Sequence, residues 1–365
     1  MKKICFLAYD MSKCGGLGRV ITSIANSLCE NEEYEFHMVT VCNSRGDKFW
    51  FPLDECIKQH VLGVNYKYRF RQIIFKSFSK LRKYLQKNKI DILFLADYTI
   101  PPIAMVVKPF VKTKIIFCDH GTLSNQLDHK KATMFRRIGC WISDKIVVLT
   151  KRNLEDYKKY FKIKENKLLV IPNWLEDELI ESPSNYDVNS KIILSCGRFT
   201  SEKGFDMLAD VADMVFRKYP DWQWHVYGGG PEFENVKEQI LKHELENNVI
   251  LKGFVDNMDD KYHGAAMFVL LSYREGLSLV LMEAKANAVP LVSFNCIAGP
   301  SEIINDGVDG YLITCYDKEE MADKICKLIE NPELRQGFSA NAKNNLGKFS
   351  KAKILKQWEE LISSF

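Results

Sequence analysis

Short apolar runs of strand type alternate with helical patterns along almost the whole chain, and this alternation restricts the possible folds strongly. Repeated strand–helix–strand units give parallel sheets that are covered by helices. The runs of strand type form two sets, which are "KICFLAYD", "EFHMVTV", "DILFLAD", "KIIFCDH", "KIVVLT" and "LLVIPN", then "KIILSCG", "WHVYGGG", "VILKGF", "MFVLLS", "PLVSF" and "GYLI". Each set is sufficient for one sheet, so the sequence predicts an α/β protein with two Rossmann-like domains.

The boundary between these domains is expected where the periodicity is lost. Residues 175–190 are rich in Pro, Ser, Asn and acidic side chains, as is typical of a linker. We therefore predict an N-terminal domain at 1–175, a C-terminal domain at 191–348, and a helix at 349–365 that crosses back to the N-terminal domain. Because open parallel sheets bind ligands at the carboxyl ends of their strands, the two sheets are expected to face each other across a ligand-binding cleft.

Composition favours a cytoplasmic protein. The eleven cysteines include no CxxC pair and no cysteine with a histidine at metal-binding spacing, so we expect reduced thiols and no metal. No apolar run is long enough for a transmembrane helix, and the N-terminal run suits a first strand better than a signal peptide. Charge is divided unevenly, because residues 1–180 contain 31 Lys and Arg against 19 Asp and Glu, while the remainder contains 20 against 28.

Two motifs at predicted strand ends are suited to phosphate. "CGGLGRV" places Gly15 and Gly16 at the start of a helix, where free amides attract an anion or a sugar oxygen. Its glycine spacing differs from that of a nicotinamide-dinucleotide turn. "CGRFTSEKGFDML" contains Arg198 and Lys203, two cations that could neutralise a diphosphate without a metal, although a solvated charge cluster is the simpler alternative.

Three further stretches are candidates for donor binding. Gly229 in "VYGGGPE" would allow a nucleotide to approach closely, and Phe254 in "KGFVDN" would line a base pocket. In "SYREGLSLVLMEAKANAVP", Glu275 lies in a loop and Glu283 lies inside an apolar helix that is expected to begin at residues 276–278. A loop carboxylate, the first amides of a helix and an inner carboxylate match the sugar, phosphate and ribose of a nucleotide sugar; an isolated structural glutamate is the alternative for Glu283.

Together these motifs resemble the retaining GT-B glycosyltransferases of family 4 that act in bacterial surface-polysaccharide synthesis. The spacing of Glu275 and Glu283 matches the E-x7-E pattern of that family, and "GGLGRV", "DHGT", "IPN", "GRFTSEKG", "GGGPE" and "GPSEIINDGVDGYL" follow in the family's order. The resemblance covers nearly the whole chain. It implies a GT-B fold and transfer of a sugar from a nucleoside-diphosphate donor.

The resemblance also implies roles for single residues. His120 would contact the donor sugar near the reaction centre, Arg198 and Lys203 would neutralise the leaving diphosphate, and Glu275 would bind sugar hydroxyls. Donor binding would further involve Gly15, Gly16, Asn173, Gly229, Phe254, Gly276, Leu277, Ser278, Leu279 and Glu283. At "IPNW" the family usually has Asn-Gly, so Trp174 departs from the pattern and leaves the role of this turn open.

A metal-independent mechanism with a UDP-linked hexose or N-acetylhexosamine is the expectation for this resemblance. The chain has no Asp-x-Asp metal motif, and no carboxylate nucleophile is obvious, which favours front-face attack with retention. A nucleotide-sugar epimerase or hydrolase of the same architecture, and a non-catalytic nucleotide-sugar-binding subunit, are the alternative functions. Free sugar as the product would favour a hydrolase, and binding without turnover would favour the subunit.

The acceptor side is represented by a basic segment. Residues 66–89 contain nine Lys and Arg and no acid, interleaved with apolar residues at helical spacing. This pattern is typical of a helix on an anionic membrane, and an ordinary helix that packs on the sheet is the alternative. The candidate membrane and acceptor surface consists of Lys67, Arg69, Arg71, Lys76, Lys80, Arg82 and Lys83. "HKKATMFRR" would add to it, and the acceptor would be a lipid-linked saccharide on the inner face of the cell membrane. The acidic second half disfavours nucleic acid as a partner.

Overall fold

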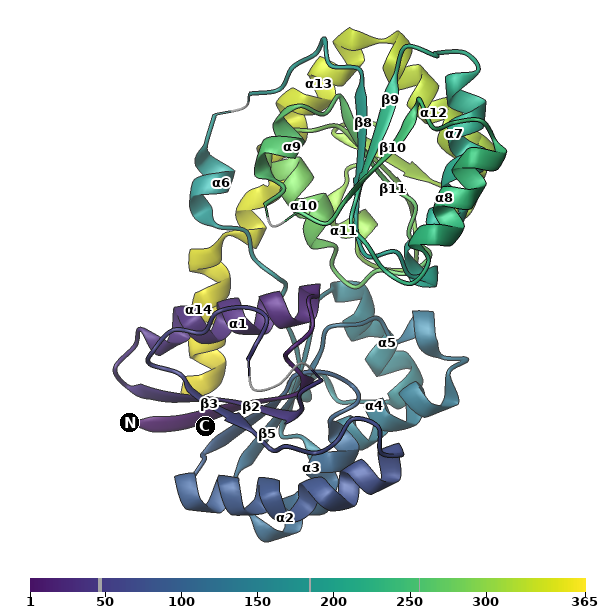
Figure 1. Ribbon diagram of the computed structural model, residues 1–365. Helices are drawn as coiled ribbons and strands as arrows, with labels where there is room; N and C mark the ends of the chain where they lie inside the picture. Colours follow the sequence, from purple (N-terminus) through teal and green to yellow (C-terminus); the bar gives the residue numbers. More distant parts are fainter. Residues whose placement is uncertain (45–47, 184, 256) are drawn as a thin grey trace. The chain divides into compact units, whose positions relative to one another are not determined.

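The chain forms two compact units in the computed structural model, which describes residues 1–44, 48–183, 185–255 and 257–365 (Figure 1). The first unit comprises Met1–Asn173 and Ala352–Phe365, and the second comprises Trp174–Lys351. The expected linker at 175–190 is therefore part of the second unit. Its first backbone amide, that of Leu175, donates to the carbonyl oxygen of Phe349 at 2.8 Å.

The first unit contains a seven-stranded sheet in which all neighbouring strands are parallel. Its order is β3-β2-β1-β4-β5-β6-β7. The strands are β1 (Lys2–Asp10), β2 (Tyr34–Cys42), β3 (Lys58–Val61), β4 (Ile92–Leu95), β5 (Lys114–Asp119), β6 (Lys145–Val148) and β7 (Leu168–Val170). Strand β3 was not predicted, because its residues "KQHV" include only one apolar side chain and lie exposed or half-buried at the edge of the sheet.

Helices cover both faces of this sheet, and for this reason its strands are apolar at consecutive positions. The helices are α1 (Gly16–Cys29), α2 (Phe70–Asn88), α3 (Pro101–Val107), α4 (Lys130–Ile142), α5 (Lys151–Phe161) and α14 (Lys351–Ser363). Strand residues such as Leu7 form one core with α2–α5. On the other face, Phe94 packs edge-on against Trp358 of α14, and Lys2 donates to the carbonyl oxygen of Ile362 at 2.9 Å. The C-terminal helix thus crosses back onto the first unit (Figure 1).

The second unit is built in the same way around six parallel strands in the order β10-β9-β8-β11-β12-β13. The strands are β8 (Ile192–Cys196), β9 (Gln223–Tyr227), β10 (Val249–Gly253), β11 (Met267–Leu270), β12 (Leu291–Phe294) and β13 (Gly310–Ile313). The helices are α6 (Asp177–Glu181), α7 (Leu208–Phe216), α8 (Phe233–Lys242), α9 (Asp259–His263), α10 (Leu279–Ala286), α11 (Pro300–Ile303), α12 (Lys318–Glu330) and α13 (Pro332–Ala342). The predicted fold class, two Rossmann-like α/β domains with parallel sheets, is confirmed.

Helix α2 carries the basic segment, and its apolar stripe packs on the sheet. Ile73, Leu81 and Leu85 are buried in the core of the first unit, and Ile74 and Phe78 are partly buried against that core. The simpler alternative therefore accounts for the stripe, and most of the cationic side chains of α2 are exposed. Within the described part of the chain, no helix combines the length and the hydrophobicity that crossing a bilayer requires.

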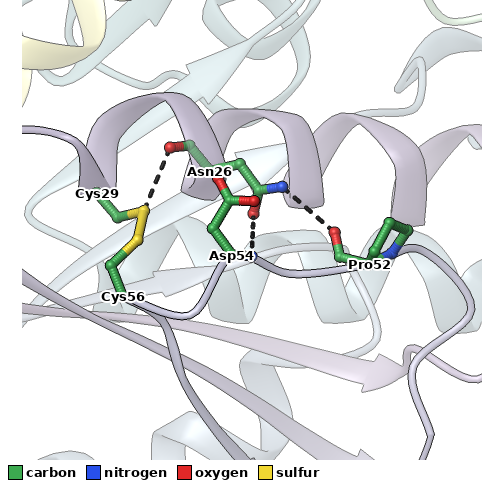
Figure 2. The surroundings of a disulfide bond; sticks show 5 residues. All are labelled: Asn26, Cys29, Pro52, Asp54 and Cys56. Atoms are coloured by element: carbon green, nitrogen blue, oxygen red, sulfur yellow. Dashed lines mark hydrogen bonds between the residues drawn. A yellow bond between two sulfur atoms is a disulfide. The ribbon is translucent and has the colours of Figure 1, made fainter.

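The cysteines depart from the expectation that all of them are reduced. Cys29, at the end of α1, and Cys56, shortly before β3, form a disulfide bond (Figure 2). The other nine cysteines, all within the described residues, form no disulfide, and Cys315 alone among these nine is exposed. Sequence spacing gave no sign of this pair, because the two cysteines are 27 residues apart and are brought together by the tertiary fold.

Candidate active site

Both sheets have a topological switch point, where strand order reverses and the connections leave in opposite directions. In the second unit this point lies between β8 and β11, and in the first unit between β1 and β4. Most predicted site residues follow the strands at or beside these points. Arg198 and Lys203 follow β8, Glu275 follows β11, Gly15 and Gly16 follow β1, and His120 follows β5.

Lys203 and Glu275 meet across the switch point of the second unit. The Lys203 ammonium donates to a Glu275 carboxylate oxygen at 2.6 Å, and the side chains are 23% and 7% exposed. Sequence analysis assigned them to different parts of the donor and did not predict this ion pair. A half-buried, directly hydrogen-bonded pair of charges is held more firmly than a surface ion pair.

The turn that carries Lys203 depends on a glycine. Gly204 has φ +67°, and a Cβ atom added there would lie 1.9 Å from the backbone oxygen of Leu271, at the end of β11. Only glycine fits this close approach and this conformation. The backbone of Tyr273 also donates to the Glu202 carbonyl at 2.9 Å. The loops after β8 and β11 are thus packed together, which brings Lys203 and Glu275 within reach of each other.

Glu283 lies on α10, which is buried along nearly all its length. The residue is only 7% exposed, and one carboxylate oxygen accepts a hydrogen bond from the Tyr262 hydroxyl at 3.1 Å. Burial, with smaller effects from Cys196 and Glu283, raises the pKa of Tyr262 well above its ordinary value, so this hydroxyl stays a donor. Lys285 pairs with Asp309 at 2.7 Å in the interior and fixes the same helix. Glu283 is thus oriented by a hydrogen bond from α9.

The start of α10 offers unused hydrogen-bonding groups. The helix begins at Leu279 with Ser278 as the N-cap residue, slightly later than expected, and Gly276 and Leu277 lie in the preceding loop. Within the described ranges, the buried hydroxyls of Ser278, Ser272 and Thr200 have no hydrogen-bond partner. Buried hydroxyls are rarely left unpaired unless water or a ligand satisfies them. All three belong to the loops that follow β8 and β11.

The remaining predicted residues of the second unit lie at neighbouring strand ends. Arg198 is exposed directly after β8. Gly229 follows β9, and a Cβ atom there would meet nothing within 4 Å, so its place borders open space. Phe254 follows β10 and is 57% exposed, as a side chain that stacks on a ligand could be. Asp256 of the same motif lies outside the described residues.

In the first unit, the loop between β1 and α1 borders open space at Gly15. Gly15 is the N-cap residue of α1 and Gly16 is its first residue. The Gly15 backbone is extended, with φ 169°, and a Cβ atom would meet no other atom within 4 Å. The fold therefore does not need glycine at residue 15 for its own packing. Asn173, by contrast, is buried at the end of this unit.

His120 follows β5 in a turn that is held by buried side chains. Arg136 of α4 is fully buried and donates to both carboxylate oxygens of Asp119, at 2.7 and 3.2 Å. Asp119 also accepts hydrogen bonds from the Tyr157 hydroxyl at 2.7 Å and from the Gly121 amide at 3.1 Å. Burial alone would raise the pKa of Asp119, but Arg136 and these donors hold it below its ordinary value. His120 therefore projects from a rigid, charged support.

The His120 imidazole is neutral near pH 7. Burial lowers its pKa to about 4, and the nearby Asp119 carboxylate opposes this effect only partly. A neutral imidazole can donate or accept a hydrogen bond but adds no positive charge to the site. This state suits contact with a sugar hydroxyl better than contact with a phosphate.

Sequence reasoning missed the residues that support the site. Arg136 belongs to "HKKATMFRR", which was interpreted as a cationic surface, yet it is buried and pairs with Asp119. Tyr262 lies in the unremarkable segment "DKYHG". Only for Arg136 did the sequence contain an indication, and it was weak. Asp119 ends a buried strand, and a buried aspartate requires a cation somewhere in the fold.

The predicted membrane and acceptor residues lie on and before α2. Lys67, Arg69, Arg71, Lys76 and Lys83 are exposed. Two others are engaged with the protein, because Lys80 donates to the backbone oxygens of Leu62 and Gly63 at 2.6 and 3.2 Å and Arg82 stacks on Phe110.

Two α/β units with parallel sheets, each with candidate site residues at its switch point, are the architecture of GT-B glycosyltransferases. Two family models match consecutive parts of the chain: the one described as "Glycosyltransferase Family 4" matches residues 14–179, and the one described as "Glycosyl transferases group 1" matches residues 176–345. The chain belongs to the GT-B glycosyltransferases of family 4.

Known proteins resemble the chain over its full length. The amylovoran biosynthesis glycosyltransferase AmsD of Erwinia amylovora is 26% identical over all of both chains. A Campylobacter jejuni enzyme, named GalNAc-alpha-(1->4)-GalNAc-alpha-(1->3)-diNAcBac-PP-undecaprenol alpha-1,4-N-acetyl-D-galactosaminyltransferase, is 26% identical over all of this chain and 99% of its own. A mutant of TarM from Staphylococcus aureus, solved in complex with fondaparinux, alpha-GlcNAc-glycerol and UDP, has a TM-score of 0.82 at 18% identity over 99% of this chain and 100% of its own.

Proposed function

We propose that this glycosyltransferase moves a hexose or N-acetylhexosamine from a UDP-sugar to a lipid-linked saccharide, with retention of the anomeric configuration and without a metal. The observation that carries the proposal is the Lys203–Glu275 pair, 2.6 Å apart at the switch point of the second unit. A cation and a carboxylate in contact suit a ligand in which a phosphate lies next to a sugar.

The donor would bind along the groups that follow β8 and β11. Lys203 and Arg198 would neutralise the diphosphate, and Glu275 would accept hydrogen bonds from the sugar. The Ser278 hydroxyl and the first amides of α10 would meet phosphate oxygens, since a helix N-terminus attracts anions. Glu283, with one carboxylate oxygen held by Tyr262, would accept hydrogen bonds from the ribose diol.

Catalysis would come mainly from stabilising the leaving group. When the anomeric C–O bond breaks, the electron pair stays on the diphosphate oxygen, where Lys203 and Arg198 stabilise the new charge. The acceptor oxygen then bonds to the anomeric carbon on the face that the diphosphate leaves, and its proton passes to the departing phosphate. Neutral His120 would hold a sugar hydroxyl during this step.

Relatives support the choice of donor and acceptor. The TarM mutant was solved with UDP, the Campylobacter jejuni enzyme is named for an undecaprenol-linked saccharide, and AmsD is named for amylovoran biosynthesis. A donor and acceptor of these classes would place the protein in bacterial polysaccharide assembly. The polyprenyl acceptor would be reached at the inner face of the cell membrane.

Membrane contact would involve α4 as well as α2. Met134 and Trp141 on α4 are 51% and 75% exposed, and Arg137 lies between them at helical spacing. The two helices are neighbours, because Phe70 of α2 stacks on Phe135 of α4 with ring centroids 4.9 Å apart. Exposed aromatic, thioether and cationic side chains together suit the headgroup region of an anionic bilayer.

Calorimetric titration with UDP-, GDP- and ADP-sugars, each with and without EDTA, tests the donor. The proposal expects one UDP-sugar to bind best and EDTA to have no effect. Incubation of that donor with a polyprenyl-diphosphate saccharide should give an α-linked product from an α-linked donor, as read from the anomeric proton coupling. Release of free sugar without a glycoside would favour a hydrolase, and binding without any turnover would favour a binding subunit.

Sedimentation with vesicles tests the membrane contact separately. Wild-type protein should bind vesicles that contain anionic phospholipid more strongly than neutral vesicles, and Trp141→Ala should weaken this binding. An exposed side chain leaves the fold intact when it is replaced. If wild type and variant sediment equally with the vesicles, α4 is not part of the membrane-binding surface.

A further inference from the structure

A cluster of potential metal ligands lies at the end of α1, apart from the groups assigned to sugar transfer. It consists of Cys29, Asp54 and Cys56, whose sulfur and carboxylate oxygen atoms all lie within 4.8 Å of one another. Figure 2 shows the Asp54 side chain next to the disulfide that joins the two cysteines. Cys29 is buried, while Asp54 and Cys56 are exposed, so the cluster can be reached from solvent.

The segment that carries Asp54 and Cys56 is attached to α1 by contacts that do not depend on the disulfide. The Asn26 side chain binds it twice: its amide nitrogen donates to the Pro52 oxygen at 3.3 Å, and its amide oxygen accepts from the Asp54 backbone at 3.2 Å (Figure 2). Because these hydrogen bonds bracket the turn next to Cys56, they would keep the two cysteines close together after the sulfur–sulfur bond is broken, with the sulfurs separated to non-bonded distance.

A second set of contacts holds the beginning of the same segment. The Trp50 amide donates to the Met11 oxygen at 2.9 Å. The Phe51 ring lies so close to α1 that a Cβ atom at Gly18 would be 3.5 Å from it. The reduced pair is therefore preorganised, which lowers the cost of ordering ligands around an ion.

The chemistry of the three donors selects a class of ligand. Two thiolates and one carboxylate suit zinc or a similar thiophilic divalent cation, which binds four ligands in a tetrahedron. Cys29 also ends a helix, where the free carbonyl groups favour a positive charge. We propose that, when the disulfide is reduced, Cys29, Cys56 and Asp54 bind a divalent cation of the zinc class, with water as the fourth ligand.

The bonded and metal-bound states exclude each other. A phosphine reductant breaks the sulfur–sulfur bond and takes the oxygen of one water molecule, and the two protons of that water go to the two sulfurs. Binding of the cation then displaces both thiol protons, because only thiolates ligate zinc. The site is independent of the proposed glycosyl transfer, and neither result decides the other.

Metal titration of the full-length protein tests the site. Protein reduced with a phosphine and freed of metal is titrated with Zn²⁺ against a chromophoric chelator, and separately with Co²⁺. We expect one equivalent of Zn²⁺ that is bound in competition with the chelator, and a near-ultraviolet thiolate-to-cobalt absorption band. The oxidised protein should show neither, since the sulfurs are then bonded to each other.

Matched variants identify the ligands. Cys56→Ser should abolish the cobalt band, and Asp54→Asn should weaken Zn²⁺ binding by at least about tenfold while keeping the band. Cys315→Ser replaces an exposed free cysteine elsewhere and should match wild type. No tight Zn²⁺ binding by the reduced wild type, or equal binding by wild type and Cys56→Ser, would overturn the site. Equal binding by wild type and Asp54→Asn would overturn the role of Asp54. UDP-sugar calorimetry on the same samples reports separately on donor binding.

Discussion

The Lys203 ammonium lies 2.6 Å from a Glu275 carboxylate oxygen, so the residues assigned to the phosphate and to the sugar are each other's partners. Each charge lowers the cost of holding the other in a half-buried place before any ligand arrives. A bound diphosphate would share the ammonium, and the carboxylate would then accept hydrogen bonds from sugar hydroxyls. The pair therefore orients both side chains before the donor binds.

The first prediction concerns Lys203. Lys203→Met keeps the length of the side chain and removes the charge that would stabilise the leaving diphosphate, so kcat should fall about 10² to 10³-fold. Steady-state kinetics with the preferred UDP-sugar measures this. Lys191→Met is the control, because Lys191 precedes β8 and forms an exposed ion pair of 2.5 Å with Asp221, at the amino edge of the sheet. A similar loss in both variants would show that general surface charge, and not this position, drives the reaction.

The second prediction concerns Tyr262, which touches no expected ligand but holds Glu283. Tyr262→Phe removes a buried hydrogen bond to a carboxylate, which should cost about 1.5–3 kcal/mol of unfolding free energy. Glu283 would then be oriented less firmly, and donor affinity should fall. Each 1.4 kcal/mol of binding free energy that is lost corresponds to an affinity about tenfold weaker, and kcat at saturation should change little. Calorimetry with UDP alone, together with urea denaturation, separates the two effects. If the variant is less stable but binds UDP as tightly as wild type, Tyr262 contributes to stability and does not position Glu283 for the donor.

Much of this architecture could be predicted because each sheet is buried on both faces. Continuous apolar runs such as "KIIFCDH" indicate a strand even when the neighbouring strands are unknown. All strands except β3 were predicted in this way. Residues that follow such strands lie at the carboxyl edge of the sheet by topology alone, as do Arg198, Glu275 and His120. Strand β3 has no such run, since it lies at an edge.

Pairings between distant side chains could not be predicted in the same way. Sequence periodicity gives the face of a helix, but it does not say which residue a buried group meets. Arg136 was therefore interpreted as a surface cation, although it pairs with Asp119. The disulfide between Cys29 and Cys56 was not predicted. Both depend on the packing of segments that are far apart in the sequence.

The third prediction is a pH dependence that arises from His120. Its pKa is about 4 in the folded protein and near 6.5 when exposed, so between these values the unfolded chain binds more protons. Stability should therefore fall as the pH drops from about 6.5 to 4, and His120 should account for about 2 kcal/mol of that loss at pH 5. Urea denaturation at pH 7 and pH 5 measures the change.

His120→Gln is the matched variant for this effect, because it keeps a polar side chain that cannot titrate. The fall in stability between the two pH values should be smaller in the variant than in wild type by that amount. Other groups titrate equally in both proteins and cancel in the comparison. An identical pH dependence of the two proteins would mean that the His120 imidazole is hydrated and has an ordinary pKa.

The fourth prediction compares three glycines. Gly15→Ala and Gly229→Ala add a methyl group that meets nothing within 4 Å, so stability should stay within about 0.5 kcal/mol of wild type. If these positions face the donor, both variants should nevertheless bind UDP-sugar more weakly. Gly204→Ala should instead lose at least about 2 kcal/mol of unfolding free energy, since its Cβ would overlap the Leu271 oxygen. Full donor affinity in Gly15→Ala would exclude that glycine from the site.

The fifth prediction concerns the support beneath His120. Arg136→Met leaves the Asp119 carboxylate buried without its cation, and loss of one partner from a buried pair costs about 3–5 kcal/mol. Asp119→Asn combined with Arg136→Met removes both charges, so the double variant should be more stable than the sum of the single losses predicts. Its turnover should still be low, because the amide of Gly121 and the hydroxyl of Tyr157 lose the carboxylate that fixes the turn around His120. Stability restored together with full activity would show that the pair serves folding alone, whereas stability restored without activity would place Asp119 and Arg136 among the residues that position His120.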